Sequence, residues 1–248
     1  MATVQDFRGQ RIWIIGASAG IGASLAQSAA ARGAHVILSA RDADALGAVA
    51  RDCPGAQIEP LDLAQPKTLE AVAEKLAAQS SLDAIICTAA LYDPGRVTDL
   101  DPEKTAAMVQ VNLLGMLHVA RLCPPLLRRG GQLVLFGSVA GYVGLPGGQP
   151  YSATKAAVNN LAESLAVELA PNVRVRLVCP GFVRTRLTEK NTFAMPALIS
   201  PQEAANAVLK GMKQRSFEIH FPRRFTMAIK FLRILPYWLS LGLLRRIG

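Results

Sequence analysis

A tyrosine and a lysine stand four positions apart in the segment 151–155, which reads YSATK. On a helix this spacing places both side chains on one face. A phenol has a pKa of about 10, so Tyr151 is a poor base near neutral pH unless a cation stabilises the phenolate. Lys155, one helical turn away, could supply that cation. Another hydroxyl, that of Ser138, lies where a predicted buried strand ends. Tyr and Lys at this spacing are also common on helix surfaces, so a catalytic interpretation depends on the motifs around them.

A glycine-rich turn follows the first predicted strand. The segment 16–22 reads GASAGIG, and a helical pattern begins at Gly20. Glycines let a dinucleotide pyrophosphate approach the backbone, and a helix N-terminus offers N–H donors and partial positive charge. The spacing is GxxxGxG rather than GxGxxG, so an ordinary turn remains the alternative. The position of the turn in the first strand–helix unit favours dinucleotide binding.

The second predicted strand ends at Ser39, Ala40 and Arg41, where a dinucleotide-binding fold contacts the adenosine ribose. An acidic residue there would bind the 2′-hydroxyl and repel a 2′-phosphate. Here Arg41 could form a charge-assisted bond with a 2′-phosphate, and Ser39 could add a hydroxyl donor. The alternatives are a solvated arginine and a pairing with Asp42 that weakens its effect. We expect a moderate preference for NADP(H) over NAD(H).

Short apolar strands alternate with alanine-rich helical patterns through most of the chain. This alternation predicts right-handed strand–helix–strand units and a parallel sheet, and continuous apolar runs predict helices on both of its faces. We therefore predict a doubly wound α/β fold, whose carboxyl edge is where such sheets bind ligands. The predicted strands are 11–15, 35–39, 57–61, 83–87, 132–136, 173–178 and 216–221, and the predicted helices are 20–32, 43–52, 66–79, 103–128, 152–170 and 201–214.

Composition narrows the class of protein. The chain has 248 residues, of which 51% are apolar and 18% charged, as expected for a globular protein rather than a disordered one. Its four cysteines form no CxxC pair and its three histidines show no ligand spacing, so we predict no metal site and a reducing compartment. The first twenty residues resemble neither a signal nor a transit peptide. We expect a cytoplasmic protein.

Most of the positive charge lies near the C-terminus. The net charge is +9, and the segment from Arg215 onward carries +6 of it, with Glu218 its one acidic residue. Residues 1–214 show neither a cluster of basic residues on one face nor a sequence motif typical of nucleic-acid recognition, so we predict no nucleic-acid partner. We expect a catalytic domain over residues 1–221 and a basic hydrophobic tail over residues 222–248.

The tail is predicted to be amphipathic. Its longest charge-free stretch, 234–244, has 11 residues and contains Pro236, so it is too short to span a bilayer. Two interpretations stay open: a segment in the headgroup region of an anionic membrane, or an arm docked on the substrate cleft or on another subunit. Basic residues and two aromatic residues, Tyr237 and Trp238, accompany an apolar face at helical spacing made of Phe225, Ile229, Leu232 and Leu235.

These motifs, in this order and spacing, resemble the short-chain dehydrogenase/reductase family in its single-domain form of roughly 250 residues. The resemblance covers about residues 9–215 and implies a Rossmann-like sheet of seven strands in the order 3-2-1-4-5-6-7. It also implies four catalytic residues: Asn112, Ser138, Tyr151 and Lys155. The residues that it and the ribose argument assign to cofactor binding are Gly16, Ser18, Gly20, Ile21, Gly22, Ser39, Arg41, Asp62, Leu63, Ala89, Tyr151, Lys155, Pro180, Gly181, Val183 and Thr185.

The sequence departs from the family pattern in two places. The segment 87–90 reads CTAA where the family has Asn-Asn-Ala-Gly, and Ile15 replaces a threonine before the first glycine. Loss of both partners of a buried hydrogen bond can be nearly neutral, whereas loss of one leaves the other unpaired. We interpret the two changes as a compensated pair, while Ala90 adds a methyl group near the cofactor.

The resemblance implies NADP(H)-dependent interconversion of a carbonyl and a secondary alcohol. Tyr151 would donate the proton, Lys155 would hold the nicotinamide ribose and lower the pKa of Tyr151, Ser138 would bind the substrate oxygen, and Asn112 would position a water. Apolar side chains in the loop 142–146 and the lid 184–200 favour a lipophilic substrate. The alternatives are an NAD-linked alcohol dehydrogenase and a non-catalytic cofactor-binding regulator. A homodimer or homotetramer through helices 103–128 and 152–170 is expected from the family.

Overall fold

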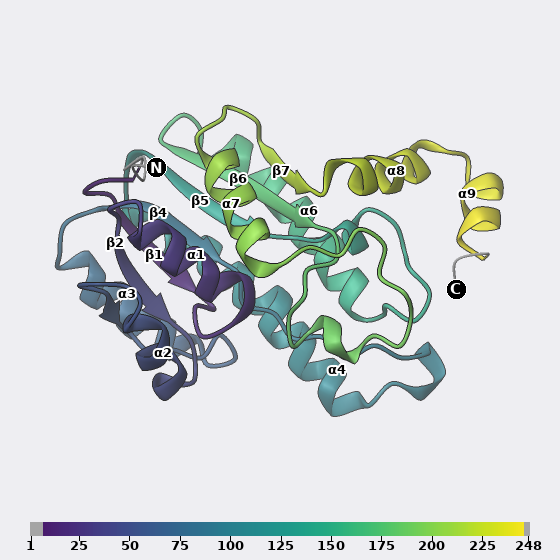
Figure 1. Ribbon diagram of the computed structural model, residues 1–248, viewed down its shortest axis with the longest axis horizontal. Helices are drawn as coiled ribbons and strands as arrows, with labels where there is room; N and C mark the ends of the chain where they lie inside the picture. The colour runs from purple at the N-terminus through teal and green to yellow at the C-terminus, as the bar shows by residue number, and fades with distance from the viewer. Residues whose placement is uncertain (1–6, 246–248) are drawn as a thin grey trace.

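The computed structural model describes residues 7–245, which form one parallel sheet of seven strands with helices on both faces (Figure 1). The strand order β3-β2-β1-β4-β5-β6-β7 confirms the prediction. Because the strands are parallel, their carboxyl ends share one edge of the sheet. The strands are β1 (Arg11–Ile15), β2 (His35–Ser39), β3 (Gln57–Ile58), β4 (Leu82–Cys87), β5 (Leu127–Phe136), β6 (Val173–Pro180) and β7 (Glu218–Phe221).

The helices between the strands begin and end close to the predicted positions, except that two helices, α4 and α5, replace the single helix predicted over 103–128. A π-helical turn, Gln110–Leu114, joins α4 to α5. The α-helices among residues 7–245 are α1 (Gly20–Ala30), α2 (Ala43–Ala50), α3 (Pro66–Ala77), α4 (Pro102–Val109), α5 (Gly115–Leu122), α6 (Tyr151–Glu168), α7 (Pro201–Met212), α8 (Arg223–Ile234) and α9 (Tyr237–Leu244).

Two apolar layers hold the sheet between its helices. Strand side chains alternate between faces, so Trp13 and Ile15 of β1 pack in the layer that contains residues of α3, α5 and α6. Ile12 and Ile14 pack in the opposite layer, with residues of α1, α2 and α7. Burial on both faces explains why β1 is apolar from Ile12 onward and β4 from Ala84 onward.

Two predicted elements have different bounds in the structure. The helix predicted over 103–128 ends at Leu122, and β5 begins at Leu127 rather than at residue 132. Pro124 and Pro125 lack backbone N–H donors and stop the helix, while Leu127 pairs with Leu82 of β4. The strand predicted over 57–61 is reduced to Gln57–Ile58, although the N–H groups of Glu59 and Leu61 still donate to the backbone oxygens of Leu38 and Ala40.

The tail forms two helices beyond β7 at the edge of the sheet (Figure 1). Within residues 7–245, none of the helices has the length and apolar character needed to cross a bilayer. The predicted apolar face of the tail packs in part on the body: Ile229 is buried, and the Phe225 ring lies 5.6 Å from that of Phe182. This packing agrees with the docked-arm interpretation of that face. The division into a catalytic domain and a tail at 221/222 stays a prediction.

Candidate active site

Helix α6 brings the tyrosine and the lysine to the carboxyl edge of the sheet. It begins at Tyr151, and Lys155 lies on the same buried stripe as Val158, Ala162 and Leu165. Lys155 is only 1% exposed, and its Nζ donates a 2.7 Å hydrogen bond to the backbone oxygen of Phe136, the last residue of β5. The same Nζ lies 5.6 Å from the centroid of the Tyr151 ring.

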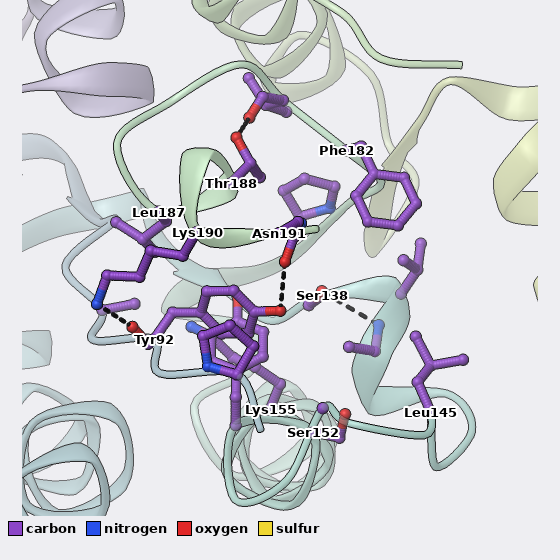
Figure 2. A pocket seen from close by; sticks show the side chains of 18 of the residues that line it. Tyr92, Ser138, Leu145, Ser152, Lys155, Phe182, Leu187, Thr188, Lys190 and Asn191 are labelled. Carbon is purple, nitrogen blue, oxygen red and sulfur yellow. Dashed lines mark hydrogen bonds between the residues drawn. The ribbon is translucent and has the colours of Figure 1, made fainter. Parts of the chain in front are cut away.

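Ser138 lies two residues after the end of β5 and completes this group. Its Oγ accepts a 3.1 Å hydrogen bond from the N–H of Ala140, which begins the short 3-10 helix Val139–Gly141. Ser138, Tyr151 and Lys155 all line one cavity of about 420 Å³ (Figure 2). The structure therefore brings together three of the four predicted catalytic side chains.

Burial controls the protonation of this group. Burial raises the pKa of Tyr151, and the hydrogen bond with Ser138 only partly opposes that shift. The net shift is therefore upward, and the predicted lowering of the Tyr151 pKa by Lys155 stays a prediction. Burial also lowers the pKa of Lys155 to about 8, although nearby Cys87 and Cys179 oppose the shift. At neutral pH the phenol therefore carries its proton, which is the form that can protonate a carbonyl oxygen.

Asn112 lies in the π-helical turn and holds a neighbouring loop. Its Oδ1 accepts a 2.7 Å hydrogen bond from the N–H of Leu91, and its Nδ2 donates to the backbone oxygen of Leu91 at 2.8 Å. The same Nδ2 lies 3.3 Å from the hydroxyl of Thr154 on α6. Asn112 is fully buried and lines neither cavity described here. Its side chain fixes the loop after β4, and the predicted positioning of a water stays a prediction.

The glycine turn forms the floor of a second cavity, also of about 420 Å³. Gly16 has a φ of +94°, and a Cβ there would lie 2.6 Å from the backbone nitrogen of Ala89. A Cβ on Gly22 would overlap the carbonyl oxygen of Gly16. The turn closes at this width only because these positions lack side chains. The N-terminus of α1 opens onto the same space, so the cavity fits a dinucleotide pyrophosphate.

Most residues predicted to bind the cofactor line these two cavities. The cavity over the glycine turn continues past Arg41 to the Asp62–Leu63 pair. The two cavities share five residues, Ile21, Thr88, Ala90, Thr185 and Leu187, so they adjoin one another. The predicted residues that line the cavity over the glycine turn are Gly16, Ser18, Gly20, Ile21, Gly22, Arg41, Asp62, Leu63, Ala89 and Thr185. Those that line the cavity at Tyr151 are Tyr151, Lys155, Pro180, Gly181 and Val183.

Ser39 is the exception and corrects the prediction. Its side chain is fully buried, and its hydroxyl donates a 2.6 Å hydrogen bond to the backbone oxygen of Glu59. It also accepts a 2.8 Å bond from Nε1 of Trp13. These bonds tie β1, β2 and the segment after β3 together, so the hydroxyl is not directed at a cofactor.

Asp42 caps α2 by accepting a hydrogen bond from the N–H of Ala45, and it lines the cavity beside Arg41.

The departures at Ile15 and Cys87 fit one another. The two residues are paired in the register of β1 and β4, and both are buried. Burial raises the pKa of the Cys87 thiol to about 12, so the thiol stays neutral. An apolar side chain and a neutral thiol leave no strong donor or acceptor unpaired at this position, as expected for a compensated pair.

The profile of the family described as short chain dehydrogenase matches residues 10–195 of this sequence. The chain belongs to the short-chain dehydrogenase/reductase family. An uncharacterized oxidoreductase of Myxococcus xanthus is 32% identical over 231 residues, which cover 90% of this chain and 91% of that protein.

Solved structures agree with this membership. A short-chain dehydrogenase of Sphingobium yanoikuyae in complex with NADPH is 28% identical, with a TM-score of 0.78 over 86% of this chain and 88% of that one. A short chain dehydrogenase of Burkholderia cenocepacia in complex with NADP is 27% identical, with a TM-score of 0.77 over 92% and 99% of the two chains.

In this short-chain dehydrogenase, Thr88 stabilises the glycine turn through hydrogen bonds to its backbone. Its hydroxyl lies 3.1 Å from the carbonyl oxygens of both Ile15 and Gly16, and its N–H donates to Ile15 at 2.8 Å. The sequence showed Thr88 only as a departure from the family pattern. Its role depends on contact between β1 and the loop after β4, which are more than 70 residues apart.

Tyr92 is a second residue that sequence reasoning missed. Its ring packs edge-on against Tyr151 with centroids 4.9 Å apart, and its hydroxyl donates to Oδ1 of Asn191 at 2.7 Å (Figure 2). Nζ of Lys190 donates to the backbone oxygen of Tyr92 at 2.7 Å. These contacts hold the predicted lid over Tyr151. A signal was present, since Tyr92 is an aromatic residue just after the fourth strand.

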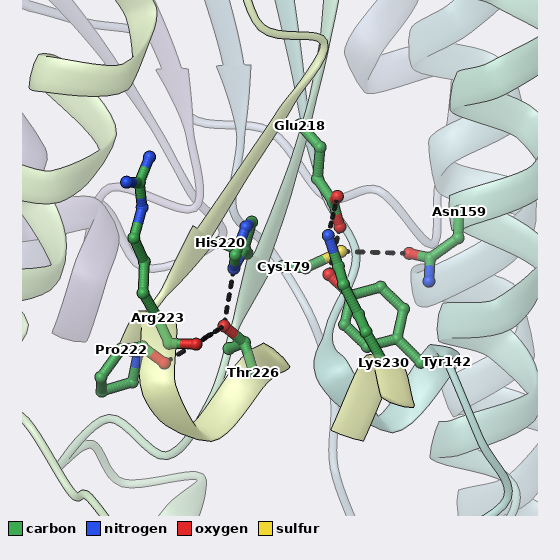
Figure 3. Close-up of polar contacts among 9 residues, drawn as sticks. All are labelled: Tyr142, Asn159, Cys179, Glu218, His220, Pro222, Arg223, Thr226 and Lys230. Carbon is green, nitrogen blue, oxygen red and sulfur yellow. Dashed lines mark hydrogen bonds and ion pairs between the residues drawn. The ribbon is translucent and has the colours of Figure 1, made fainter. Parts of the chain in front are cut away.

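The walls of the cavity at Tyr151 differ in part from the predicted ones. Leu145 and Pro146 line it, but Tyr142 does not: its hydroxyl bonds to Glu218 of β7 (Figure 3). The lid contributes Phe193, whereas Met195 does not line the cavity. The other apolar side chains of the lining include Tyr92, Pro94, Phe136, Val139, Phe182, Val183 and Leu187.

The pKa of Lys155 leads to a testable pH dependence. The ammonium form is the one that can hold a ribose hydroxyl and act as a cation, and it is lost as the pH rises through about 8. We expect the affinity for NADPH to weaken above that pH, measured as the dissociation constant by fluorescence titration. Tyr151→Phe should show the same dependence, because the titrating group is the lysine. A dissociation constant that stays level through this range would contradict the assignment.

Proposed function

We propose that the protein is an NADP(H)-dependent oxidoreductase that interconverts a carbonyl and a secondary alcohol on a lipophilic substrate. One observation carries this proposal: Ser138, Tyr151 and Lys155 line a largely apolar cavity that shares part of its wall with the cavity over the glycine turn. Two of the similar solved structures hold NADPH or NADP, which supports the choice of cofactor. Arg41 at the far end of the glycine-turn cavity supports it as well.

The side chains divide the chemistry between them. When bound, NADP(H) supplies or accepts the hydride. Ser138 would donate a hydrogen bond to the substrate oxygen, and Tyr151 would donate its proton to that oxygen during reduction. Lys155 would hold the nicotinamide ribose, and Thr185 with the backbone of Pro180–Thr185 would hold the carboxamide. Burial raises the pKa of Tyr151, so the phenol carries its proton at neutral pH, as the proton-donor role in reduction requires.

The cavity walls support a lipophilic substrate. Aromatic and aliphatic side chains enclose the catalytic hydroxyls, and the Phe182 and Phe193 rings lie 5.8 Å apart at the lid. Apolar groups of a substrate would be removed from water there, at a gain of roughly 25 cal/mol per Å² of buried surface. A small, strongly hydrated substrate would not obtain this gain.

A cofactor-consumption assay tests the proposal. Purified protein with NADPH should reduce medium-chain and aromatic ketones or aldehydes, and kcat/KM should rise as apolar groups are added to the substrate. Small polar carbonyls should react slowly. Consistent preference for small hydrophilic carbonyls would overturn the lipophilic assignment. Binding of NADPH without turnover of any carbonyl or alcohol would favour the alternative of a non-catalytic regulator.

Coenzyme choice is expected to depend on Arg41. A charge-assisted hydrogen bond to the 2′-phosphate contributes about 1.5–3 kcal/mol, so Ala40→Asp combined with Arg41→Ile should change the NADPH/NADH ratio of kcat/KM by about tenfold or more. Arg51→Ile removes another exposed arginine outside the cavity and should leave the ratio unchanged. If the native enzyme used both coenzymes equally well, Arg41 would be a solvated residue and the NAD-linked alternative would gain support.

The predicted homodimer or homotetramer remains part of the proposal, to be measured by sedimentation.

A further inference from the structure

The two tail helices carry a second apolar surface that faces away from the body. On α8, Met227, Phe231 and Ile234 follow the i, i+4, i+7 spacing of one helix face and are 55–76% exposed. This outer face differs from the predicted one, whose Phe225 and Ile229 pack on the body. Helix α9 adds exposed Tyr237, Trp238 and Leu241. We call these six exposed side chains the tail surface.

The inner side of α8 is fixed, so the tail surface has a defined direction. Nζ of Lys230 pairs with Glu218 of β7, and the hydroxyl of Tyr142 bonds to the same carboxylate (Figure 3). The hydroxyl of Thr226 lies 2.6 Å from Nδ1 of His220. These contacts from buried and half-buried groups hold one side of the helix against β7 and leave the other side outward.

Positive charge surrounds the tail surface. Arg223 and Arg224 are one residue apart at the start of α8, and on a helical wheel they flank the strip of Met227, Phe231 and Ile234 on its two sides. Arg233 and Arg245 are exposed as well. The sequence has no acidic residue after Glu218, and Lys230 already neutralises Glu218.

This combination matches an anionic lipid surface. Apolar and aromatic side chains enter the headgroup boundary, where Tyr and Trp are favoured, while arginines pair with lipid phosphates. A second copy of the chain fits poorly. A two-fold contact would place the same arginine-rich surface on both sides, with no acidic residue to pair. We propose that the tail surface docks the protein peripherally on an anionic membrane.

The position of α8 relates this docking to the cavity. Phe225 on its inner side contacts Phe182 of the cavity wall, so the membrane would lie on the opposite side of a helix that forms part of the wall's support. The docking proposal itself does not depend on the proposed reaction, and its test uses no activity measurement.

Tryptophan fluorescence gives a direct readout, because the chain has two tryptophans in opposite surroundings. Trp13 is 0% exposed, whereas Trp238 is 78% exposed. A change in emission on adding vesicles therefore reports Trp238. With vesicles of phosphatidylglycerol and phosphatidylcholine at low salt, we expect a blue shift, protection from acrylamide quenching and co-sedimentation. Pure phosphatidylcholine vesicles and high salt should weaken all three effects.

Point variants are sharper than truncation, because removal of α8 would also expose the body beneath it. Met227→Ser, Phe231→Ser and Ile234→Ser together should reduce the vesicle partition coefficient by about tenfold or more. The control Val97→Ser with Val167→Ser removes exposed apolar side chains elsewhere and should bind as the native protein does. Arg223→Gln with Arg224→Gln should also weaken binding by about tenfold or more, whereas Arg51→Gln with Arg129→Gln should not.

Two results would overturn the proposal. The first is native protein that stays in the supernatant with unchanged emission at low salt and high anionic lipid content. The second is a blue shift that needs no vesicles and grows with protein concentration while the sedimenting mass increases, since the tail surface would then join copies of the chain. All substituted side chains are exposed, so each variant should fold, and circular dichroism would check this before binding is compared.

Discussion

Tyr151→Phe is expected to reduce carbonyl turnover by about a hundredfold or more, because the substitution removes the proton donor and little else. The ring still packs edge-on against Tyr92, and Lys155 keeps its hydrogen bond to Phe136. NADPH affinity should therefore change little. Single-turnover kinetics and a binding titration on the same preparation separate the two effects.

Tyr92→Phe is the matched control for that experiment. It removes the other phenolic hydroxyl of this edge-on pair, and with it the 2.7 Å bond to Asn191. Turnover should fall only slightly, since the lid keeps the bond from Lys190 to the backbone of Tyr92. Lys155→Met should differ from both variants by damaging turnover and cofactor binding together. If Tyr151→Phe kept more than about a hundredth of the native rate, Tyr151 could not be the general acid.

Gly22→Ala is expected to disrupt the cofactor cavity. Alanine normally improves a helix, but a methyl group here would overlap the carbonyl oxygen of Gly16, and both groups belong to a tightly bonded turn. Overpacking of this kind costs about 1–3 kcal/mol, so the variant should unfold at a lower urea concentration and bind NADPH at least about tenfold more weakly. Denaturant titration and fluorescence titration measure the two effects.

Gly47→Ala provides the opposite expectation in a neighbouring helix. Gly47 lies in α2, and an added Cβ meets nothing within 4 Å. Alanine should stabilise the protein by about 0.5–1 kcal/mol there, with unchanged NADPH affinity. Equal behaviour of the two variants would show that the shape of the turn around Gly22 does not limit binding.

Local sequence determined the parts of this protein that depend on periodicity and on short motifs. Continuous apolar runs predicted strands buried on both faces, and α3, α4 and α7 each begin at a proline, a residue that favours the first turn of a helix. The glycines at 16, 20 and 22 and the helical spacing of Tyr151 and Lys155 placed both parts of the site at one sheet edge. These features are predictable because each depends on residues close together in the chain.

Tertiary structure decided which polar groups remain available for a ligand. Ser39 lies at the position expected of a cofactor ligand, yet its hydroxyl is used by Trp13 and Glu59. Thr88 supports the glycine turn across more than 70 residues of sequence. In the same way, packing on β7 turned one apolar face of α8 inward and left the other exposed. Local patterns indicate which groups can bond, but only the folded chain brings distant partners together and determines which groups are already satisfied.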